Sequence, residues 1–203
     1  MGWRDIAMGL PPGILDTVTS TLLYDLFTDA DATSLDAHTP TPITPGNAWV
    51  EVVGDWAITS NAAYIGASVL VSRAFIDIGQ RASVVTGSVR TGAVAASPAG
   101  IFCRADPAGN TGWMLDIVYG TNLVRLYEVT GASAPNYTLR DSVAFTVADQ
   151  FYTLELQDDG TNIVGLVDGV EKVSYTSAAY AAQTGVGLGA NNTAARFDWL
   201  QAR

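Results

Sequence analysis

The sequence predicts an all-β fold, an antiparallel two-sheet sandwich or barrel, on three observations. Short runs rich in β-branched and aromatic residues recur along the chain, and each is closed by Gly, Asn, Asp or Pro. Polar and apolar residues alternate within several runs, as they do in strands with one buried face. No stretch shows a convincing 3.6-residue pattern of helix length, so stacked antiparallel sheets are the expected architecture.

Residues 1–22 differ from the rest and are predicted to be an N-terminal arm. Pro11, Pro12 and Gly13 interrupt this segment, which excludes a continuous helix or a central strand. An exposed arm with many large apolar groups would be sticky, so we expect it to be covered. It either folds back over its own sandwich or docks on a neighbouring subunit. The candidate assembly residues of the arm are Trp3, Ile6, Met8, Leu10, Ile14 and Leu15.

Residues 23–203 are predicted to form the sandwich as one domain, which suits a chain of 203 residues. Asp159-Gly160 and Asp168-Gly169 fit tight hairpin turns, in which the backbone φ angle is positive. After a first run at 22–27, about eleven strand regions are expected by this pattern. They lie at 49–61, 62–79, 82–96, 99–106, 113–120, 122–130, 151–160, 162–169, 170–176, 184–191 and 195–203.

Composition and charge argue against several classes of function. The chain has a formal net charge of −10 and a pI near 4.2, and it lacks a basic stripe for phosphates, so we expect no nucleic-acid partner. No window is long and apolar enough for a membrane span, and the first residues lack the pattern of a secretion signal. Cys103 is the one cysteine and lies in an apolar run, which predicts a buried residue without an intrachain disulfide.

The order of motifs in the second half of the chain resembles a known family. "GIFCRAD", with Arg104 and Asp106, is followed by "NLVRLYEV", by a hairpin from Tyr152 to Gly169, by "GVGL", and by a closing strand that contains Asp198. This order resembles the laminin-G-like members of the concanavalin A-like lectin and glucanase superfamily, across residues 23–203. The resemblance implies a jelly-roll sandwich that frequently binds carbohydrate. The opening segment also looks like such domains in bacteriophage virion and tail-associated proteins, where they serve as decoration or fibre modules.

The sequence predicts no enzymatic activity. Hydrolytic relatives in the superfamily carry E-x-D-x-x-E on one strand, because one carboxyl group protonates the leaving oxygen while another attacks. In this chain Glu155 and Asp158 fall on opposite phases of a strand, and we expect Asp158 at a solvated strand end and turn. His38, the one histidine, is expected to hydrogen-bond within its loop.

No cofactor is required by these patterns, but calcium is a candidate. Sandwiches of the resembled family often bind it where the first and last strands lie side by side, and carboxylate oxygens suit this hard cation. The alternative is that the same residues are ordinary turn formers that bond their own backbone. The candidate ligands are Asp25, Asp29, Asp31 and Asp198.

A glycan site needs aromatic faces for the C–H groups of sugars and a few polar side chains on a preformed surface. Arg125 and Tyr127 project together from one strand, and Glu155 and Gln157 are candidates on a neighbouring strand. These four residues are the predicted glycan-binding residues. Large aromatic side chains in sandwiches usually pack in the core or under a loop, and this is the expectation for Trp49, Trp56, Trp113 and Trp199.

These observations lead to a hypothesis with alternatives. The first is a non-enzymatic structural component of a phage-like virion, a decoration or tail- or fibre-associated protein with a glycan-binding surface. It would be made in the host cytoplasm, released by lysis, and bound to other virion subunits or to itself as a homo-oligomer. The alternatives are a free, extracellular carbohydrate-binding module of a bacterial protein, or a glycan-cleaving enzyme. A cell-surface glycan is a candidate partner.

Overall fold

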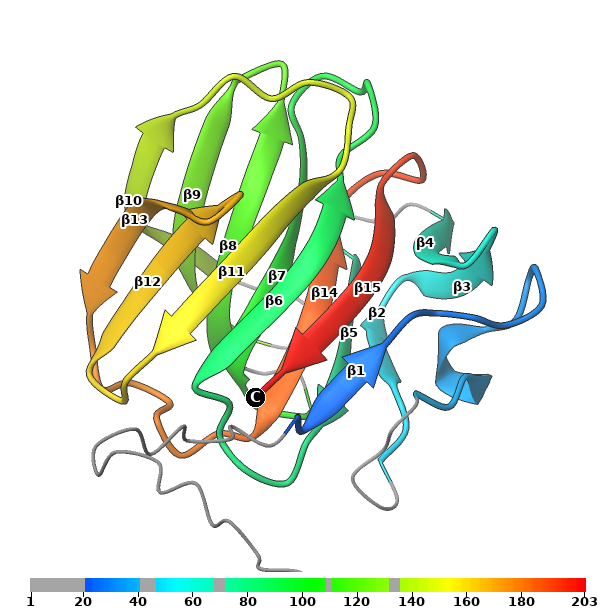
Figure 1. The fold of residues 1–203 in the computed structure, drawn as a ribbon, viewed down its shortest axis with the longest axis horizontal. Helices are drawn as coiled ribbons and strands as arrows, with labels where there is room; N and C mark the ends of the chain where they lie inside the picture. The colour runs from blue at the N-terminus through cyan, green and yellow to red at the C-terminus, as the bar shows by residue number, and fades with distance from the viewer. Residues whose placement is uncertain (1–20, 41–46, 68–71, 109–110, 132–135) are drawn as a thin grey trace, which may run out of the picture.

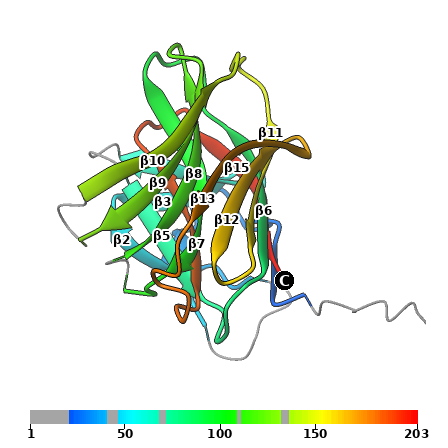
Figure 2. The same cartoon turned by 90° about the vertical axis from the view of Figure 1, so that its left-hand side faces the viewer.

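The structure, a computed structural model, describes residues 21–40, 47–67, 72–108, 111–131 and 136–203. They form two antiparallel sheets stacked face to face (Figures 1 and 2). A short 3-10 helix, η1 (Leu35–Ala37), precedes the second strand. Sheet A has eight strands, which pair in the order β13 (Val170–Thr176), β12 (Asn162–Val167), β11 (Tyr152–Asp158), β6 (Val84–Arg90), β15 (Arg196–Ala202), β4 (Ala62–Ala67) and β3 (Asp55–Thr59), with β1 (Leu23–Asp25) also on β15. Sheet B has seven strands, in the order β10 (Asn136–Ala144), β9 (Leu123–Thr130), β8 (Thr111–Tyr119), β7 (Ser97–Ala105), β14 (Gly185–Ala190), β5 (Ser72–Asp77) and β2 (Val50–Val53).

The predicted all-β, antiparallel jelly-roll sandwich is confirmed, although the strands are more numerous than expected. The described residues contain fifteen strands, and the expected regions at 49–61 and 62–79 each contain two of them. The sequence pattern missed β10 altogether. This edge strand is exposed along most of its length, so it carries no alternation of buried and polar residues to recognise.

The core lies between the two sheets and contains the side chains that the alternation predicted. Leu154 and Leu156 of β11 are fully buried in the same cluster as Leu126 of β9 in the opposite sheet. The predicted burial of Cys103 is confirmed, and burial raises the pKa of its thiol. Three of the four tryptophans named above are also buried as expected: Trp49, Trp56 and Trp113.

A buried ion pair joins the two sheets and corrects the prediction for Asp158. This residue ends β11 and is only 4% exposed, so it does not lie at a solvated strand end. Its carboxylate accepts hydrogen bonds from Arg104 of β7 in sheet B, one of them from Nε at 2.9 Å. Arg104 also donates to the carbonyls of Ser177 and Ala179. A buried carboxylate needs such a partner, and the Arg in "GIFCRAD" supplies it.

The two predicted hairpin turns have the expected backbone geometry. Asp168 and Gly169 have φ angles of 49° and 76°, and they join β12 directly to β13. Gly160, in the turn between β11 and β12, has a φ angle of 97°. Both turns use residues that tolerate the left-handed region.

The N-terminal arm lies almost entirely outside the described residues, which begin at 21, so its six candidate assembly residues are not placed. The predictions that it folds back or docks on a neighbour therefore stay predictions. Across the described ranges, no helix has the length and apolar character that a membrane crossing demands.

Candidate functional site

The candidate site is the outer face of sheet A, the side that points away from the core. Because side chains alternate along a strand, Leu154 and Leu156 of β11 enter the core while Thr153, Glu155 and Gln157 point outward. The pairing of β11 with β6, and of β6 with β15, aligns such outward residues in rows across the sheet.

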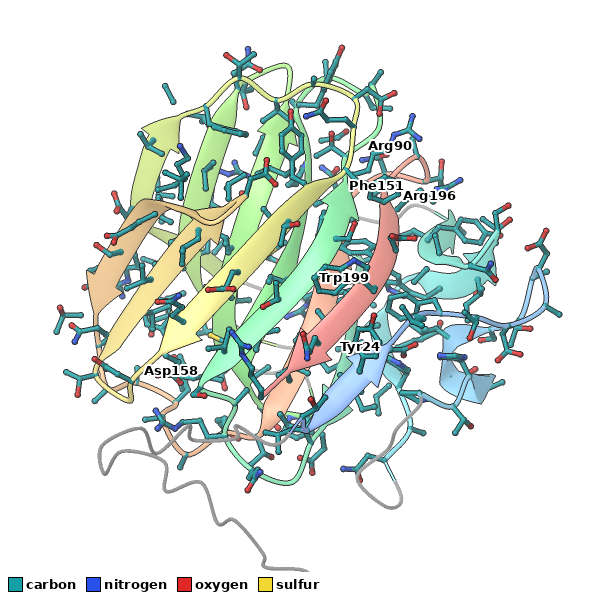
Figure 3. The ribbon with its side chains drawn as sticks, in the orientation of Figure 1. Tyr24, Arg90, Phe151, Asp158, Arg196 and Trp199 are labelled. Atoms are coloured by element: carbon teal, nitrogen blue, oxygen red, sulfur yellow. The ribbon has the colours of Figure 1, made fainter. Side chains whose placement is uncertain are left out.

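Three aromatic side chains cross this face, Tyr24, Trp199 and Phe151, which we call the aromatic stripe (Figure 3). Tyr24 of β1 pairs with Gln201 of β15, and Trp199 lies two positions earlier on the same strand and face. Phe151 directly precedes β11. Tyr24 is 36% exposed, Phe151 is 43% exposed, and Trp199 is half-buried. Strand spacing and rise give the stripe a length of roughly 20 Å over β1, β15, β6 and β11.

A β-bulge in β15 places Trp199 in the stripe. The register with β6 shifts between Phe197 and Trp199, so that Asp198 is an extra residue. Phe197 and Leu200 are both fully buried, although they are three positions apart. Without the bulge, Trp199 would share the inward face with Phe197. The expectation that Trp199 packs in the core is therefore wrong.

A row of polar side chains runs beside the stripe. Gln201 of β15 pairs with Thr86 of β6, and Thr86 pairs with Glu155 of β11. Thr86 Oγ1 donates a hydrogen bond to Glu155 Oε2 at 3.4 Å, and Gln157 Nε2 donates to Glu155 Oε1 at 2.6 Å. The row therefore begins at the strand partner of Tyr24, and two donors and a shared carboxylate acceptor lie along it on β6 and β11.

One hollow lies at the Phe151 end of the stripe and has a volume of about 360 Å³. Arg90 and Arg196 are paired residues of β6 and β15 and both line it. Arg90 forms a bidentate ion pair with Asp149, with Nε–Oδ1 and Nη2–Oδ2 distances of 2.6 and 2.7 Å. We call this hollow the arginine pocket; its lining is Thr59, Ser60, Ala62, Arg90, Phe151, Arg196 and Asp198.

Arg196 is held in place without a carboxylate partner. Its Nη1 donates to the carbonyls of Thr193 and Ala195, both at 2.7 Å, and its guanidinium carbon lies 4.9 Å from the centre of the Tyr64 ring. Burial lowers the pKa of Arg196, and the charge of Arg90 adds to this effect against the influence of Tyr64. No ion pair involves Arg196 within the part of the chain that the structure describes.

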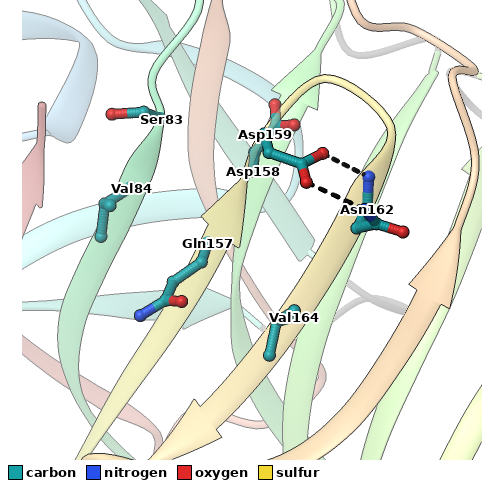
Figure 4. A pocket seen from close by; sticks show the side chains of 7 residues that line it. All are labelled: Ser83, Val84, Gln157, Asp158, Asp159, Asn162 and Val164. Carbon is teal, nitrogen blue, oxygen red and sulfur yellow. Dashed lines mark hydrogen bonds between the residues drawn. The ribbon is translucent and has the colours of Figure 1, made fainter.

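A second hollow, of about 270 Å³, lies on the same face near the turn between β11 and β12 (Figure 4). Asp159 accepts hydrogen bonds from the backbone N–H groups of Asn162 and Thr161 at 2.6 and 2.8 Å, and from the Asn162 side chain at 2.9 Å. These bonds hold the pKa of Asp159 at about 2. The Asp159 carboxylate is used to stabilise the turn. The side chain that lines this hollow and also belongs to the polar row is Gln157.

The outer face of sheet B is occupied by its own apolar side chains. Phe75, Phe102 and Met114 point away from the main core yet are at most 1% exposed, and they form a second cluster with Val129. The rings of Phe75 and Phe102 meet edge to face, with centroids 4.9 Å apart. Gly189 of β14 makes room for them, because a Cβ there would lie 2.7 Å from the Phe102 ring.

Sheet B curves toward this cluster. Nη1 and Nη2 of Arg73 on β5 each lie 3.3 Å from the carbonyl oxygen of Gly131, which directly follows β9. Three strands separate β5 from β9, which corresponds to roughly 19 Å across a flat sheet. The contact therefore requires this face of sheet B to be concave, so that Arg73 on β5 reaches the carbonyl at the end of β9.

Arg125 and Tyr127, two of the predicted glycan-binding residues, are engaged on this second face. Arg125 forms a bidentate ion pair with Asp116 of β8, at 2.9 and 2.7 Å, and its guanidinium carbon lies 4.9 Å from the centre of the Tyr127 ring. Tyr137 meets the Tyr127 ring edge to face, at 5.7 Å between centroids. Burial raises the pKa of Asp116, although the hydrogen bonds and charge of Arg125 act in the opposite direction.

The four predicted glycan-binding residues do not form one site. Arg125 and Tyr127 lie on β9 of sheet B, whereas Glu155 and Gln157 lie on β11 of sheet A, so the two pairs face opposite sides of the sandwich. The expectation that β11 neighbours β9 is wrong, because strand order is set by pairings between distant segments. The aromatic stripe was missed, and its signal in the sequence is hidden by the bulge at Asp198.

The four candidate calcium ligands are also not brought together. Asp25 and Asp29 flank His38, whose Nε2 lies 2.8 Å from Asp25 Oδ1 and whose Nδ1 lies 2.9 Å from Asp29 Oδ2. Asp31 accepts a hydrogen bond from the backbone of Ser60. Asp198 lines the arginine pocket instead. The described ranges contain no group of three or more acidic, His or Cys side chains that could hold a metal ion, so the four carboxylates do not form the single predicted cluster.

The His38 bridge is an ion-pair cluster that fixes β1. Burial would lower the pKa of His38, but the hydrogen bonds and charges of Asp25 and Asp29 together raise it. The hydrogen bond and charge of His38 in turn lower the pKa of Asp29. Asp25 also accepts hydrogen bonds from the Trp49 indole and from the backbone of Phe27. The expected role of His38 within its own loop is thus extended to a strand of sheet A.

Comparisons with known proteins agree with this architecture. No protein-family model and no curated protein sequence matches the chain. A carbohydrate-binding module, CBM66 from Bacillus subtilis, superposes with a TM-score of 0.60 at 13% identity over 74% of this chain and 91% of that one. A Bacillus licheniformis β-glucanase gives 0.56 at 13% identity over 91% and 98%. The Caenorhabditis elegans galectin LEC-6 gives 0.50 at 11% identity over 69% and 93%. The chain therefore has the concanavalin A-like jelly-roll fold that carbohydrate-binding modules, galectins and β-glucanases share.

Proposed function

We propose that this chain is a carbohydrate-binding protein that holds an extended glycan on the outer face of sheet A. The observation that carries the proposal is the aromatic stripe, Tyr24, Trp199 and Phe151, three partly exposed rings in line on a rigid sheet. Within the described residues none of these rings takes part in an aromatic or cation–π contact.

The chemistry of the stripe suits a sugar chain. Sugar rings present C–H groups that stack on aromatic faces and hydroxyl groups that need paired donors and acceptors. The polar row of Gln201, Thr86, Glu155 and Gln157 supplies those groups beside the rings. With a length of roughly 20 Å, the stripe is suited to several sugar units rather than one. Fold neighbours that are themselves carbohydrate-binding proteins support the same reading.

We propose binding rather than cleavage. Glycoside hydrolysis generally needs two carboxyl groups across the scissile bond, about 5 to 10 Å apart depending on the mechanism. On the outer face of sheet B, Asp116 of β8 has Gly112, Met114 and Val118 on the same side of its strand, and none of these carries a carboxyl group. Asp116 is already bound by Arg125. Incubation with β-glucans, followed by a reducing-sugar assay, tests this directly, because sustained release of sugar would establish an enzyme.

The binding experiment compares the two faces of the sandwich. Isothermal titration calorimetry of the full chain with β-1,3- and β-1,4-linked oligosaccharides is expected to find a ligand. Trp199→Ala should then weaken binding about tenfold or more, because it removes the central stacking ring. Tyr127→Ala is the matched control on sheet B and should leave binding unchanged. The proposal fails if no oligosaccharide binds, or if Tyr127→Ala abolishes binding and Trp199→Ala does not.

The place of this protein in a phage-like virion remains a proposal that rests on the sequence. Its support is the apolar arm at 1–22 and the order of motifs, and the same reasoning gives the expected virion location and homo-oligomeric or virion partners. Light scattering of the full chain, and of a variant with Trp3→Asp and Leu10→Asp, tests the arm. Assembly that disappears in the variant supports the virion proposal. A full chain that stays monomeric argues for a free carbohydrate-binding module.

A further inference from the structure

The arginine pocket at the Phe151 end of the aromatic stripe contains two charged side chains, Arg196 and Asp198, that no ion pair uses among the described residues. The other arginine of the pocket, Arg90, is neutralised by Asp149 through two short hydrogen bonds. A cation and an anion that share a hollow without pairing are available to a ligand from solvent. We propose that this pocket binds a sugar unit that carries a carboxylate group, such as a uronic acid. This inference rests on the proposed function.

The lining of the pocket matches the parts of such a sugar. A planar guanidinium recognises a carboxylate with two parallel hydrogen bonds, and Arg196 supplies one. Asp198 accepts hydrogen bonds from sugar hydroxyls, and the side chains of Thr59 and Ser60 line the same hollow. Phe151, 43% exposed, offers a ring face for the C–H side of the sugar. Asp198 repels a second anion, so the ligand carboxylate is directed to Arg196.

Arg196 is already oriented for this contact. Its Nη1 is fixed by the carbonyls of Thr193 and Ala195, and the Tyr64 ring lies under the guanidinium at 4.9 Å. These contacts leave Nε and Nη2 without a hydrogen-bond partner in the described part of the chain. A side chain that is held before the ligand arrives loses less conformational entropy on binding.

The net charge of the protein limits which acidic glycans can bind in the arginine pocket. With a formal charge of −10, the protein repels a polyanion at long range. The proposed ligand is therefore a largely neutral chain with a single carboxylated sugar that enters the pocket, while neutral units lie along Trp199 and Tyr24.

The test uses pairs of oligosaccharides that differ only at one carboxyl group. Each pair consists of a β-1,3- or β-1,4-linked oligosaccharide ending in glucuronic acid and its carboxyl-reduced, glucose-ended counterpart, titrated into the full chain at neutral pH. We expect the glucuronate form to bind about tenfold more tightly, the effect of a charge-assisted hydrogen bond. Arg196→Gln should remove this preference, and Arg196→Lys should keep part of it. Arg140→Gln, at an exposed arginine of sheet B, is the matched control and should preserve it.

The outcomes separate this inference from the function on which it rests. Equal binding of both members of every pair, with Trp199→Ala still harmful, overturns the carboxylate pocket and leaves glycan binding intact. A preference that survives Arg196→Gln also overturns it. Failure of every oligosaccharide to bind overturns the proposed function itself. The comparison of paired ligands uses the unaltered protein, so equal binding and absence of binding are both recognised even where a variant fails to fold.

Discussion

The two outer faces of this sandwich are built by the same alternation of side chains but differ in what their aromatic residues contact. On sheet B, Phe75 and Phe102 pack against each other and against Met114, and almost none of their surface is exposed. On sheet A, Tyr24 and Phe151 are more than a third exposed. An aromatic ring at an outward position is therefore not by itself evidence of a ligand site, because on a curved face such rings can pack against one another.

The charged groups follow the same division. On sheet B, Arg125 and Asp116 form a bidentate ion pair with each other. On sheet A, Arg196 and Asp198 share a hollow without pairing. Sheet B uses its polar and apolar groups to stabilise the folded state, whereas the corresponding groups of sheet A are the ones that the proposed function assigns to a ligand. Three substitutions test this division, and a pH dependence tests the edge of sheet A.

The largest effect is expected for Phe102→Ala on sheet B. This side chain is fully buried although it points away from the main core, so its loss should cost about 3 to 5 kcal/mol of unfolding free energy. Urea denaturation followed by tryptophan fluorescence measures the change. A loss below about 1 kcal/mol would show that the second cluster is an open surface after all, like the face of sheet A.

The next effect concerns the ion pair on the same face. Asp116→Ala leaves the partly buried guanidinium of Arg125 without its carboxylate and should cost about 2 kcal/mol, less than a fully buried pair because Arg125 keeps some exposure. Asp198→Ala is the control on sheet A and should change the unfolding free energy by less than about 0.5 kcal/mol. Equal losses for both variants would contradict the contrast between the two faces.

A pH-dependent effect is expected at the edge of sheet A. Both ring nitrogens of His38 face carboxylates, so both bonds need the doubly protonated imidazolium. The folded pKa of His38 is raised, so its contribution to stability is fully present below the unfolded pKa of about 6.5 and is lost as pH rises through the folded value. Unfolding free energies measured from about pH 6 to pH 9 should fall in this manner. In His38→Gln, which cannot titrate, that fall should disappear.

The smallest effect on stability is expected for Trp199→Ala. Its ring lies on the open face, and its removal should cost less than about 1 kcal/mol while it removes the centre of the proposed glycan site. Thermal unfolding of the variant checks this, next to the calorimetric titration. A loss as large as that of Phe102→Ala would mean that Trp199 is a structural residue. The aromatic stripe would then lack its central ring for stacking on a sugar.

The sequence predicted the architecture better than the site. Alternation correctly placed Leu154 and Leu156 in the core and Glu155 and Gln157 outside, because that pattern is local to one strand. It failed wherever the answer depended on which strands become neighbours, as in the grouping of Glu155 with Tyr127. Pairing between distant strands depends on the whole set of contacts, and no local pattern encodes it.

Trp199 shows a second limit of the sequence. Simple alternation puts it on the same face as Phe197, and only the extra residue at Asp198 reverses this. Nothing in "RFDWLQ" indicates the bulge. The predicted grouping of the four candidate calcium ligands failed for a related reason, since Asp25 and Asp29 meet a histidine that lies in another loop of the fold.

The position of β15 has a consequence for how this protein is made. It follows the other fourteen described strands of the sandwich in sequence order, yet it lies inside sheet A, where it pairs with β6 on one side and with β4 and β1 on the other. While a ribosome still holds this strand in its exit tunnel, β1 and β6 have no template between them, and sheet A cannot close. Folding must therefore wait until synthesis has passed β15, and the nascent chain exposes its unpaired strands until then.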